Sequence, residues 1–223
     1  MRLLLFLVFC SACAGLKAQQ ELIDGFHEKA GSHASLFVGK VEHGYPASTY
    51  ANHPYWDDAR FYNGEVLYKG VWYRNLSMRY DTHLRQLAVM TPDKRMTMLV
   101  DMRQVDRFLL DGILFLKEGE SYIAELHRGP NLRLTRETEC RLATAELRDK
   151  ASYRKFSRSV RYLLYRGNDV QEVKSKSSVL KLFPRHKKAL NQYAKTHSLD
   201  FRNQRQLALS LLVAYADELE QKP

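Results

Sequence analysis

The segment between residues 43 and 62 brings aromatic, imidazole and carboxylate side chains together in a short stretch of chain. Its centre reads His53-Pro54-Tyr55-Trp56-Asp57-Asp58. Aromatic faces beside hydrogen-bonding acids can hold a sugar ring or a peptide, and binding residues tend to lie on loops carried by a rigid scaffold. The segment therefore predicts a binding loop with five candidate residues, which are His53, Tyr55, Trp56, Asp57 and Asp58. The structural alternative is that Tyr55 and Trp56 close one end of a β core while the acids cap a turn.

The same loop leaves a hydrolytic function open, with His53, Asp57 and Asp58 as candidate acid–base groups. Glycoside hydrolysis needs two carboxyl groups that face one bond, whereas neighbouring residues of an extended chain point to opposite faces. A second acid, such as Asp101, would have to approach the loop. The alternative function is therefore that of a hydrolase that acts on a cell-surface polymer.

Common catalytic and phosphate-binding motifs are absent from the sequence. It contains no G-x-S-x-G, H-E-x-x-H, Walker A or G-x-G-x-x-G pattern. None of the eight histidines is followed by another four residues later, the spacing that would place a pair on one face of a helix. We therefore assign no catalytic residue, no metal site and no cofactor from the sequence.

The first twenty residues resemble a secretory signal. Arg2 precedes the apolar run Leu3–Phe9, which is too short to span a bilayer, and small residues follow it. Cleavage after Ala14 or after Ala18 is possible, and we favour Ala18. Lipid attachment at Cys13 is an alternative, although a leucine would be expected where Cys10 stands. We expect an exported protein, periplasmic or secreted, with outer-membrane association as a further possibility.

The positive charge is concentrated in the C-terminal third of the chain. The formal net charge is +10, and residues 150–223 contain 16 Lys and Arg against 6 Asp and Glu. Such a concentration is typical of a surface that meets a polyanion, although a solvated helical face is the simpler explanation because the basic residues are spread over several elements. Export and the lack of RNA-binding or zinc-finger patterns disfavour nucleic acid. The candidate anion-binding residues are Lys174, Lys176, Lys181, Arg185, Lys187 and Lys188.

Alternating apolar and polar residues predict strands from Ser35 to about Leu134. Asp111-Gly112, between two apolar runs, predicts a type I′ hairpin turn, and further turn signals recur every 8 to 12 residues. This spacing favours an antiparallel sandwich or a partly open barrel. Cys140 is the only cysteine after the signal region, so an intramolecular disulfide is excluded once that region is removed.

After a last hairpin near residues 160–173, helical patterns begin. Ser175 or Ser177 can cap a short helix, Pro184 fits the start of a second, and Asn203 with Gln206 predicts a capping box for a third. The third helix carries an apolar stripe that we expect to dock: Leu207, Leu211, Leu212, Tyr215 and Leu219. The predicted fold class is α+β, with a signal peptide (1–18), a β-rich body (19–157) and a final hairpin with basic helices (158–223) packed on it.

Short motifs in the body resemble uncharacterised exported proteins common in Bacteroidota. They are His53-Pro54-Tyr55-Trp56, the run Gly64–Tyr73 and Tyr80-Asp81, with Val173–Lys176 and Leu180–Phe183 near the C-terminus. The resemblance implies a Gram-negative envelope or secreted location and brings no catalytic residues. The leading hypothesis is a non-catalytic envelope protein whose basic helical face or aromatic loop binds an envelope protein, an anionic lipid or a glycan. No segment after the signal is long and apolar enough to span a membrane as a helix.

Overall fold

The computed structural model describes residues 35–148 and 151–221. The predicted signal, its cleavage sites and Cys13 lie outside these residues. Ten strands and three α-helices, with three short 3₁₀ helices, make up the described fold. In chain order they are η2 (Ser35–Phe37), β1 (Tyr62–Tyr68), β2 (Val71–Asp81), β3 (Gln86–Met90), β4 (Thr97–Leu99), η3 (Met102–Gln104), β5 (Val105–Leu110), β6 (Ile113–Glu118), β7 (Ser121–Arg128), β8 (Leu132–Arg148), β9 (Ala151–Arg166), β10 (Asp169–Glu172), α2 (Lys176–Leu182), η4 (Pro184–His186), α3 (Lys187–Thr196) and α4 (Arg205–Glu220).

The predicted α+β class is confirmed. All ten strands form one antiparallel sheet in the order β10-β9-β8-β7-β6-β5-β1-β2-β3-β4, and this sheet does not close into a barrel. The predicted hairpin turn at Asp111-Gly112 is also confirmed, because both residues have positive φ angles and join β5 to β6. No helix in the described part of the chain is long and apolar enough to cross a membrane.

The strands β1 to β7 curl around the first of two hydrophobic cores. Tyr80 of β2 contacts Tyr122 of β7, with ring centroids 6.2 Å apart, although four strand-to-strand steps separate β2 from β7 in the sheet. Phe108 and Phe115, both fully buried, stack between them at 4.5 Å. Sheet twist alone does not bring such distant strands together, so the aromatic side chains mark strong curvature of this part of the sheet.

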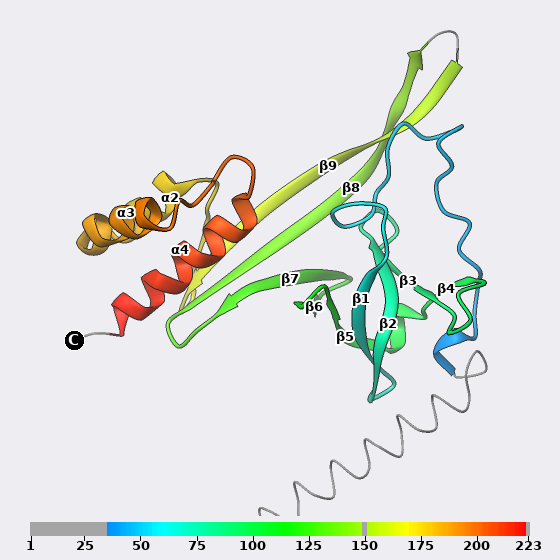
Figure 1. The fold of residues 1–223 in the computed structure, drawn as a ribbon, viewed down its shortest axis with the longest axis horizontal. Coiled ribbons are helices and arrows are strands. Elements are labelled where there is room, and N and C mark those ends of the chain that lie inside the picture. Colours follow the sequence, from blue (N-terminus) through cyan, green and yellow to red (C-terminus); the bar gives the residue numbers. More distant parts are fainter. Residues whose placement is uncertain (1–34, 149–150, 222–223) are drawn as a thin grey trace, which may run out of the picture.

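A long two-stranded ribbon, formed by β8 and β9, connects this curled body to the helices (Figure 1). Its strands have 17 and 16 residues, far longer than the strands around them. Near the helices, Leu132, Leu134 and Leu164 of the ribbon belong to the second hydrophobic core, which they share with all three α-helices. Strand β9 runs across residues 157 and 158, where the sequence predicted a boundary between two parts.

The helices begin and dock somewhat differently from the prediction. Ser175 caps α2 through a capping box with Ser178, as expected for one of the two candidate serines. The capping box predicted at Asn203 and Gln206 does not form, because the Asn203 side chain donates to Asp200 and the side-chain oxygen of Gln206 accepts from Arg136. The apolar stripe predicted on α4 is confirmed in part, because Leu212 is buried in the second core and Tyr215 and Leu219 pack against it. The buried face of α4 is made by Ala208, Leu209, Leu212, Val213 and Ala216, while Leu207 is 54% exposed.

Candidate functional site

The aromatic loop places its two largest central side chains in the body rather than on its surface. Tyr55 and Trp56 are only 2% and 3% exposed. The Trp56 ring meets Phe115 edge-on at 4.7 Å, so it belongs to the first hydrophobic core. Neither ring offers an open face on which a sugar or peptide could stack.

The loop is fastened to the ribbon by backbone and side-chain hydrogen bonds. The side-chain amide of Asn52 donates to the carbonyl of Phe156 and accepts from its N–H, at 2.8 and 2.7 Å. The amides of Ala51 and Arg154 donate to the carbonyls of Arg154 and Thr49. Tyr45 and Tyr50 then pack on the Phe156 ring. The loop therefore covers the outer edge of β9, with a single parallel β-bridge between Tyr50 and Arg154.

Asp57 is held by a buried arginine of the ribbon. Nη2 of Arg136 donates to Oδ1 of Asp57 at 2.7 Å, and its guanidinium carbon lies 3.9 Å from the centroid of the Trp56 ring. The other terminal nitrogen donates to Gln206 on α4. Arg136 thus connects the aromatic loop, the ribbon and the last helix at one point. Its partners are about 70 residues away in sequence or more.

The remaining two loop candidates lie near the surface. Asp58 pairs with Arg60 at 2.9 Å and accepts the Arg60 backbone N–H, the arrangement of an acid that caps a turn. His53 stacks beside Tyr55, and its Nδ1 atom is buried without a hydrogen-bond partner in the described chain. Burial, and secondly the nearby Arg158 charge, lower the pKa of His53 below its usual 6.5.

A polar network beneath the loop could not be read from the sequence. Nη2 of Arg79 donates to Glu42 at 2.8 Å, and the Tyr55 hydroxyl donates to the same carboxylate at 2.9 Å. The Tyr45 hydroxyl donates to Asp81, which also accepts the backbone amide of His83. Burial raises the pKa of both tyrosines above 10, so they remain neutral donors. Every carboxylate of this network is engaged by a donor of the chain itself.

The six basic candidates lie on α2, η4, α3 and the turn before them. Together with Lys195 they form what we call the basic helical face: Lys174, Lys176, Lys181, Arg185, Lys187, Lys188 and Lys195. Residues 173–199 contain these seven basic residues and no Asp or Glu. Lys174 pairs with Glu172 at 3.3 Å, and none of the other six has an acidic partner among the residues that the structure describes.

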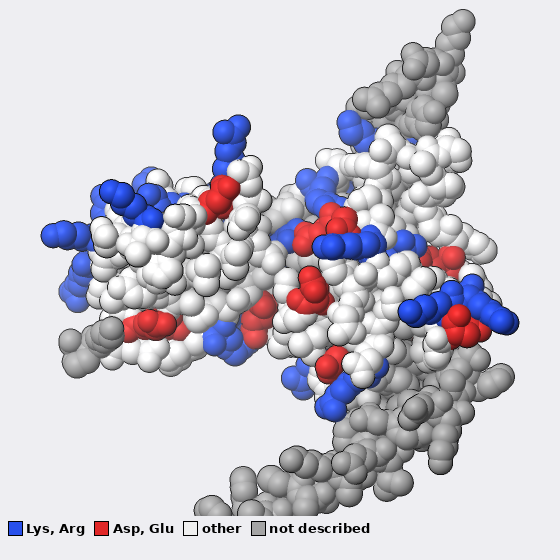
Figure 2. Space-filling model, in the orientation of Figure 1, with Lys and Arg blue, Asp and Glu red and all other residues white. Residues whose placement is uncertain are grey.

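Helix α3 is amphipathic in a way that fixes which side chains face outward. Leu190 and Ala194 are buried against the other helices, whereas Lys187, Lys188 and Lys195 are exposed. A groove of about 520 Å³ runs between α3 and the start of α2. Three lysines line it with two amides and three apolar residues: Lys176, Lys188, Lys195, Asn191, Gln192, Ala194, Leu199 and Phe201. Figure 2 shows Lys and Arg side chains gathered over the outer end of the helical lobe.

The described residues contain no group of three or more His, Cys, Asp and Glu side chains arranged to hold a metal ion. Comparisons of the chain with protein-family models, curated proteins and solved structures found no match.

Proposed function

We propose that this chain is a non-catalytic, exported cell-envelope protein that binds a polyanionic surface through its basic helical face. The observation that carries the proposal is the absence of acids from residues 173–199, which leaves six of the seven basic side chains without an acidic partner in the described chain. Elsewhere in the described structure most arginines are engaged by a nearby carboxylate. For example, Arg133 meets both Glu118 and Glu125, and Arg161 meets Glu137.

Unpaired lysines on one rigid face attract anions without first breaking an internal ion pair. Ammonium groups bind phosphate, sulfate and carboxylate groups as point charges, and they do not require the fixed geometry of a bidentate arginine. The groove beside α3 adds amide donors from Asn191 and Gln192 and two partly buried apolar residues, Leu199 and Phe201. These features favour a surface with many anionic groups over one small ligand.

An envelope location is part of this proposal. It is supported by the positive start and short apolar run of the first twenty residues and by the resemblance to exported Bacteroidota proteins. In a Gram-negative envelope, anionic lipid headgroups and anionic glycans both carry the required charge. The two sources share one chemistry and differ in whether the charges are presented on a membrane.

Binding to lipid vesicles separates the basic helical face from general positive charge. The test protein is residues 19–223, mixed with vesicles that contain phosphatidylglycerol and, in a second arm, with dextran sulfate. Each lysine near an anionic surface contributes about 1 kcal/mol, so Lys187→Glu with Lys188→Glu is expected to weaken binding by at least about 30-fold. The control is Lys40→Glu with Lys117→Glu, which makes the same change of charge at two exposed lysines of the body.

The proposal requires that the control pair retain binding and that wild-type binding fall steeply with salt. Binding to dextran sulfate alone would identify a glycan partner, and binding to vesicles alone would identify the membrane surface. Equal losses in both charge-reversal pairs would show that only net charge matters and would refute a specific face. Salt-insensitive binding would also refute it.

The aromatic loop supports a binding or hydrolytic function less well. Asp57 is paired with Arg136, and Asp58 is paired with Arg60. The rings of Tyr55 and Trp56 are buried. Asp101 caps η3 and pairs with Arg103. In the described chain each of these three carboxylates is thus already bound to an arginine.

A further inference from the structure

The strands β7 and β8 separate from each other partway along their length. Their registered pairs run from Ala124–Arg136 to Arg128–Arg133. Beyond Arg136, β8 continues to pair with β9 on its other side, and β7 pairs with β6 from Ser121 onward. Figure 1 shows the two strands diverging into a fork beside the body. In the fork, the facing edges of β7 and β8 have no strand partner among the described residues.

The contacts of β9 show which residues of β8 direct their backbone groups into this fork. Asn52 bonds both the N–H and the carbonyl of Phe156, so these groups point away from β8. In an antiparallel pair, the backbone N–H and carbonyl groups of two opposite residues point either both toward the partner strand or both away from it. The two arrangements alternate along the strand. Leu142 lies opposite Phe156, and its backbone groups therefore point away from β9.

By the same alternation, Cys140 and Thr138 also present their backbone N–H and carbonyl groups to the fork. A separate contact agrees with this: Nδ1 of His83 lies 3.0 Å from the carbonyl of Cys140 and donates to it. Thr138 lies opposite Val160 on β9. Neither group of Thr138 is used in a backbone hydrogen bond on this edge within residues 35–148 and 151–221. The edge thus offers an adjacent donor and acceptor at Thr138 and a donor at Cys140.

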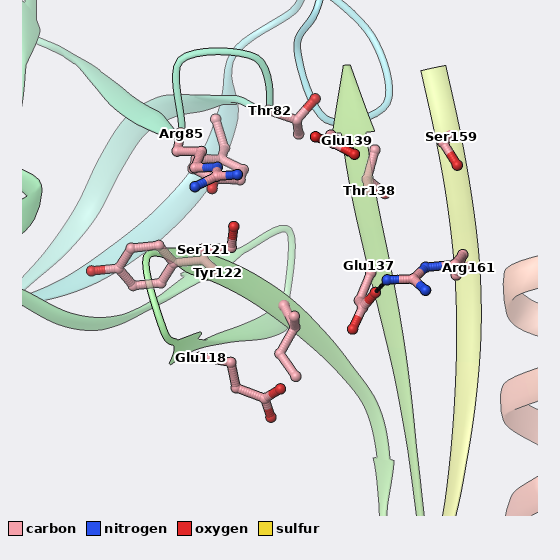
Figure 3. Close-up of a pocket in the computed structure, with 12 residues that line it drawn as sticks. Thr82, Arg85, Glu118, Ser121, Tyr122, Glu137, Thr138, Glu139, Ser159 and Arg161 are labelled. Carbon is pink, nitrogen blue, oxygen red and sulfur yellow. Dashed lines mark hydrogen bonds and ion pairs between the residues drawn. The ribbon is translucent and has the colours of Figure 1, made fainter. Parts of the chain in front are cut away.

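A cleft of about 330 Å³ lies directly against this edge (Figure 3). Three consecutive residues from each strand line it, Ser121–Ile123 of β7 and Glu137–Glu139 of β8. Because side chains of a strand alternate between its two faces, three consecutive residues can line one cleft only where it meets the strand edge. At about 30 Å³ per water, the cleft has room for on the order of ten waters, enough for a few small residues but not for a folded domain.

Each charged residue that lines the cleft lies near an opposite charge, and Glu139 pairs with Arg141 at 3.1 Å. Glu137 pairs with Arg161 at 2.6 Å, and Glu118 pairs with Arg133 at 3.1 Å. Arg85, on the turn between β2 and β3, faces the cleft from the side opposite β8 and lies 3.7 Å from Glu120. A strongly charged ligand would meet both signs here, so this lining favours small, uncharged polar side chains.

We propose that the β8 edge at Thr138 binds a short extended peptide segment with small polar side chains by strand addition. An extended backbone presents a carbonyl and an N–H with the spacing that matches the free pair on Thr138, and pairing with a strand edge is a common mode of peptide recognition. The cleft lies on the fork of the sheet and shares no residue with the groove beside α3. This inference is therefore independent of the basic helical face.

The test uses random seven-residue peptides displayed on phage, from which those that bind residues 19–223 are selected. The selection buffer contains about 0.5 M NaCl, which weakens electrostatic attraction to the basic helical face. Selected peptides are then synthesised and titrated by fluorescence polarisation. Thr138→Pro removes the N–H that points into the fork, and proline is tolerated where a strand N–H faces an open edge. Val160→Pro is the matched control, because it makes the same change at the opposite residue of the ribbon, on the other edge.

We expect Thr138→Pro to weaken peptide binding by at least about tenfold and Val160→Pro to leave it within about twofold. Ser121→Trp, which fills the cleft from β7 without altering β8, should weaken binding in the same way and keeps the test valid if Thr138→Pro does not fold. Methylating alternate amides of the peptide should abolish binding for one set of amides only. The proposal is wrong if no peptide is selected, or if the selected peptides bind wild type, Thr138→Pro and Ser121→Trp alike. It is also wrong if light scattering shows that the edge is occupied by a second copy of the chain, as a wild-type dimer that Thr138→Pro dissociates.

Discussion

Oδ2 of Asp217, in the last turn of α4, lies 2.9 Å from Nε2 of His127 on β7. The other carboxylate oxygen accepts the backbone N–H of Asn131 in the turn between β7 and β8. Asp217 is 1% exposed, although it stands among the apolar residues of the helix. One carboxylate therefore fixes both the position and the rotation of α4 against the end of the ribbon.

Replacing this carboxylate should destabilise the fold. Asp217→Ala leaves the Asn131 N–H and the His127 ring without their buried partner, so we expect a loss of about 2 kcal/mol in the free energy of unfolding. Urea denaturation followed by circular dichroism measures it. Glu218→Ala, at the exposed neighbouring position, is the control and should change stability by less than about 0.5 kcal/mol. Equal effects of the two substitutions would contradict the proposed docking role.

Gly129 should be intolerant of any side chain. A Cβ atom built there would lie 1.5 Å from Oδ2 of Asp217 and 2.9 Å from Nε2 of His127, so Gly129→Ala must displace the Asp217 carboxylate from its buried hydrogen bonds. We expect a cost of about 3 kcal/mol from this overpacking. The comparison is Gly119→Ala, where no atom lies within 4 Å and only the positive φ of 61° is unfavourable. That variant should lose about 1 kcal/mol, and thermal melting of both proteins would show whether this order holds.

Arg136 should contribute more than an ordinary surface arginine. Arg136→Met removes the bonds to Asp57 and Gln206 and the contact with the Trp56 ring, at a cost of about 2 kcal/mol. Arg136→Lys should restore little, because an ammonium group cannot reach both partners in the same geometry. Arg103→Met, at an exposed pair with Asp101, should leave the denaturation midpoint unchanged. Full rescue by lysine would show that only the charge of Arg136 matters.

His53 should make the fold sensitive to weak acid. Because the pKa of His53 is lowered in the folded state, the unfolded chain binds more protons as the pH falls below its ordinary value of 6.5. Stability is therefore fully present above about pH 6.5 and decreases as the pH falls toward the lowered pKa. His53→Gln should flatten this part of the stability curve, measured by urea denaturation between about pH 5 and pH 8. A curve with the same slope in both proteins would assign the effect to other groups.

Local patterns in the sequence predicted much of the secondary structure, for identifiable reasons. Alternation over Leu76–Tyr80 and Tyr122–Leu126 reports burial of one strand face, and it matches β2 and β7. Asp111-Gly112 determines its turn without help from the rest of the chain. Ser175 caps α2 through contacts within four residues. Each of these predictions depends on neighbours in sequence, which a linear pattern records.

The parts that sequence reasoning missed depend on distant partners. The insertion of β1 between β2 and β5 joins residues 37 to 46 positions apart. The middle of the β8–β9 ribbon, rich in Glu, Arg and Ser, carries no clear alternation because its edges and much of its surface stay exposed. Arg136 and Asp217 resemble ordinary charged residues until the fold brings Asp57 and His127 to them. The one signal available for such residues was a charge among apolar neighbours in an otherwise regular element.

The ribbon also determines how the molecule unfolds. The core beneath the helices includes Leu132 and Leu134 of β8 and Tyr162 and Leu164 of β9. Strand β9 also carries Phe156, to which the aromatic loop of the body is hydrogen-bonded. Melting of the helices would remove the cover from one end of the ribbon, and a ribbon of two strands is only marginally stable in water. Unfolding would then propagate along β8 and β9 to the body. The helices and the β body are therefore coupled into one cooperative unfolding unit, and the chain should melt in a single transition.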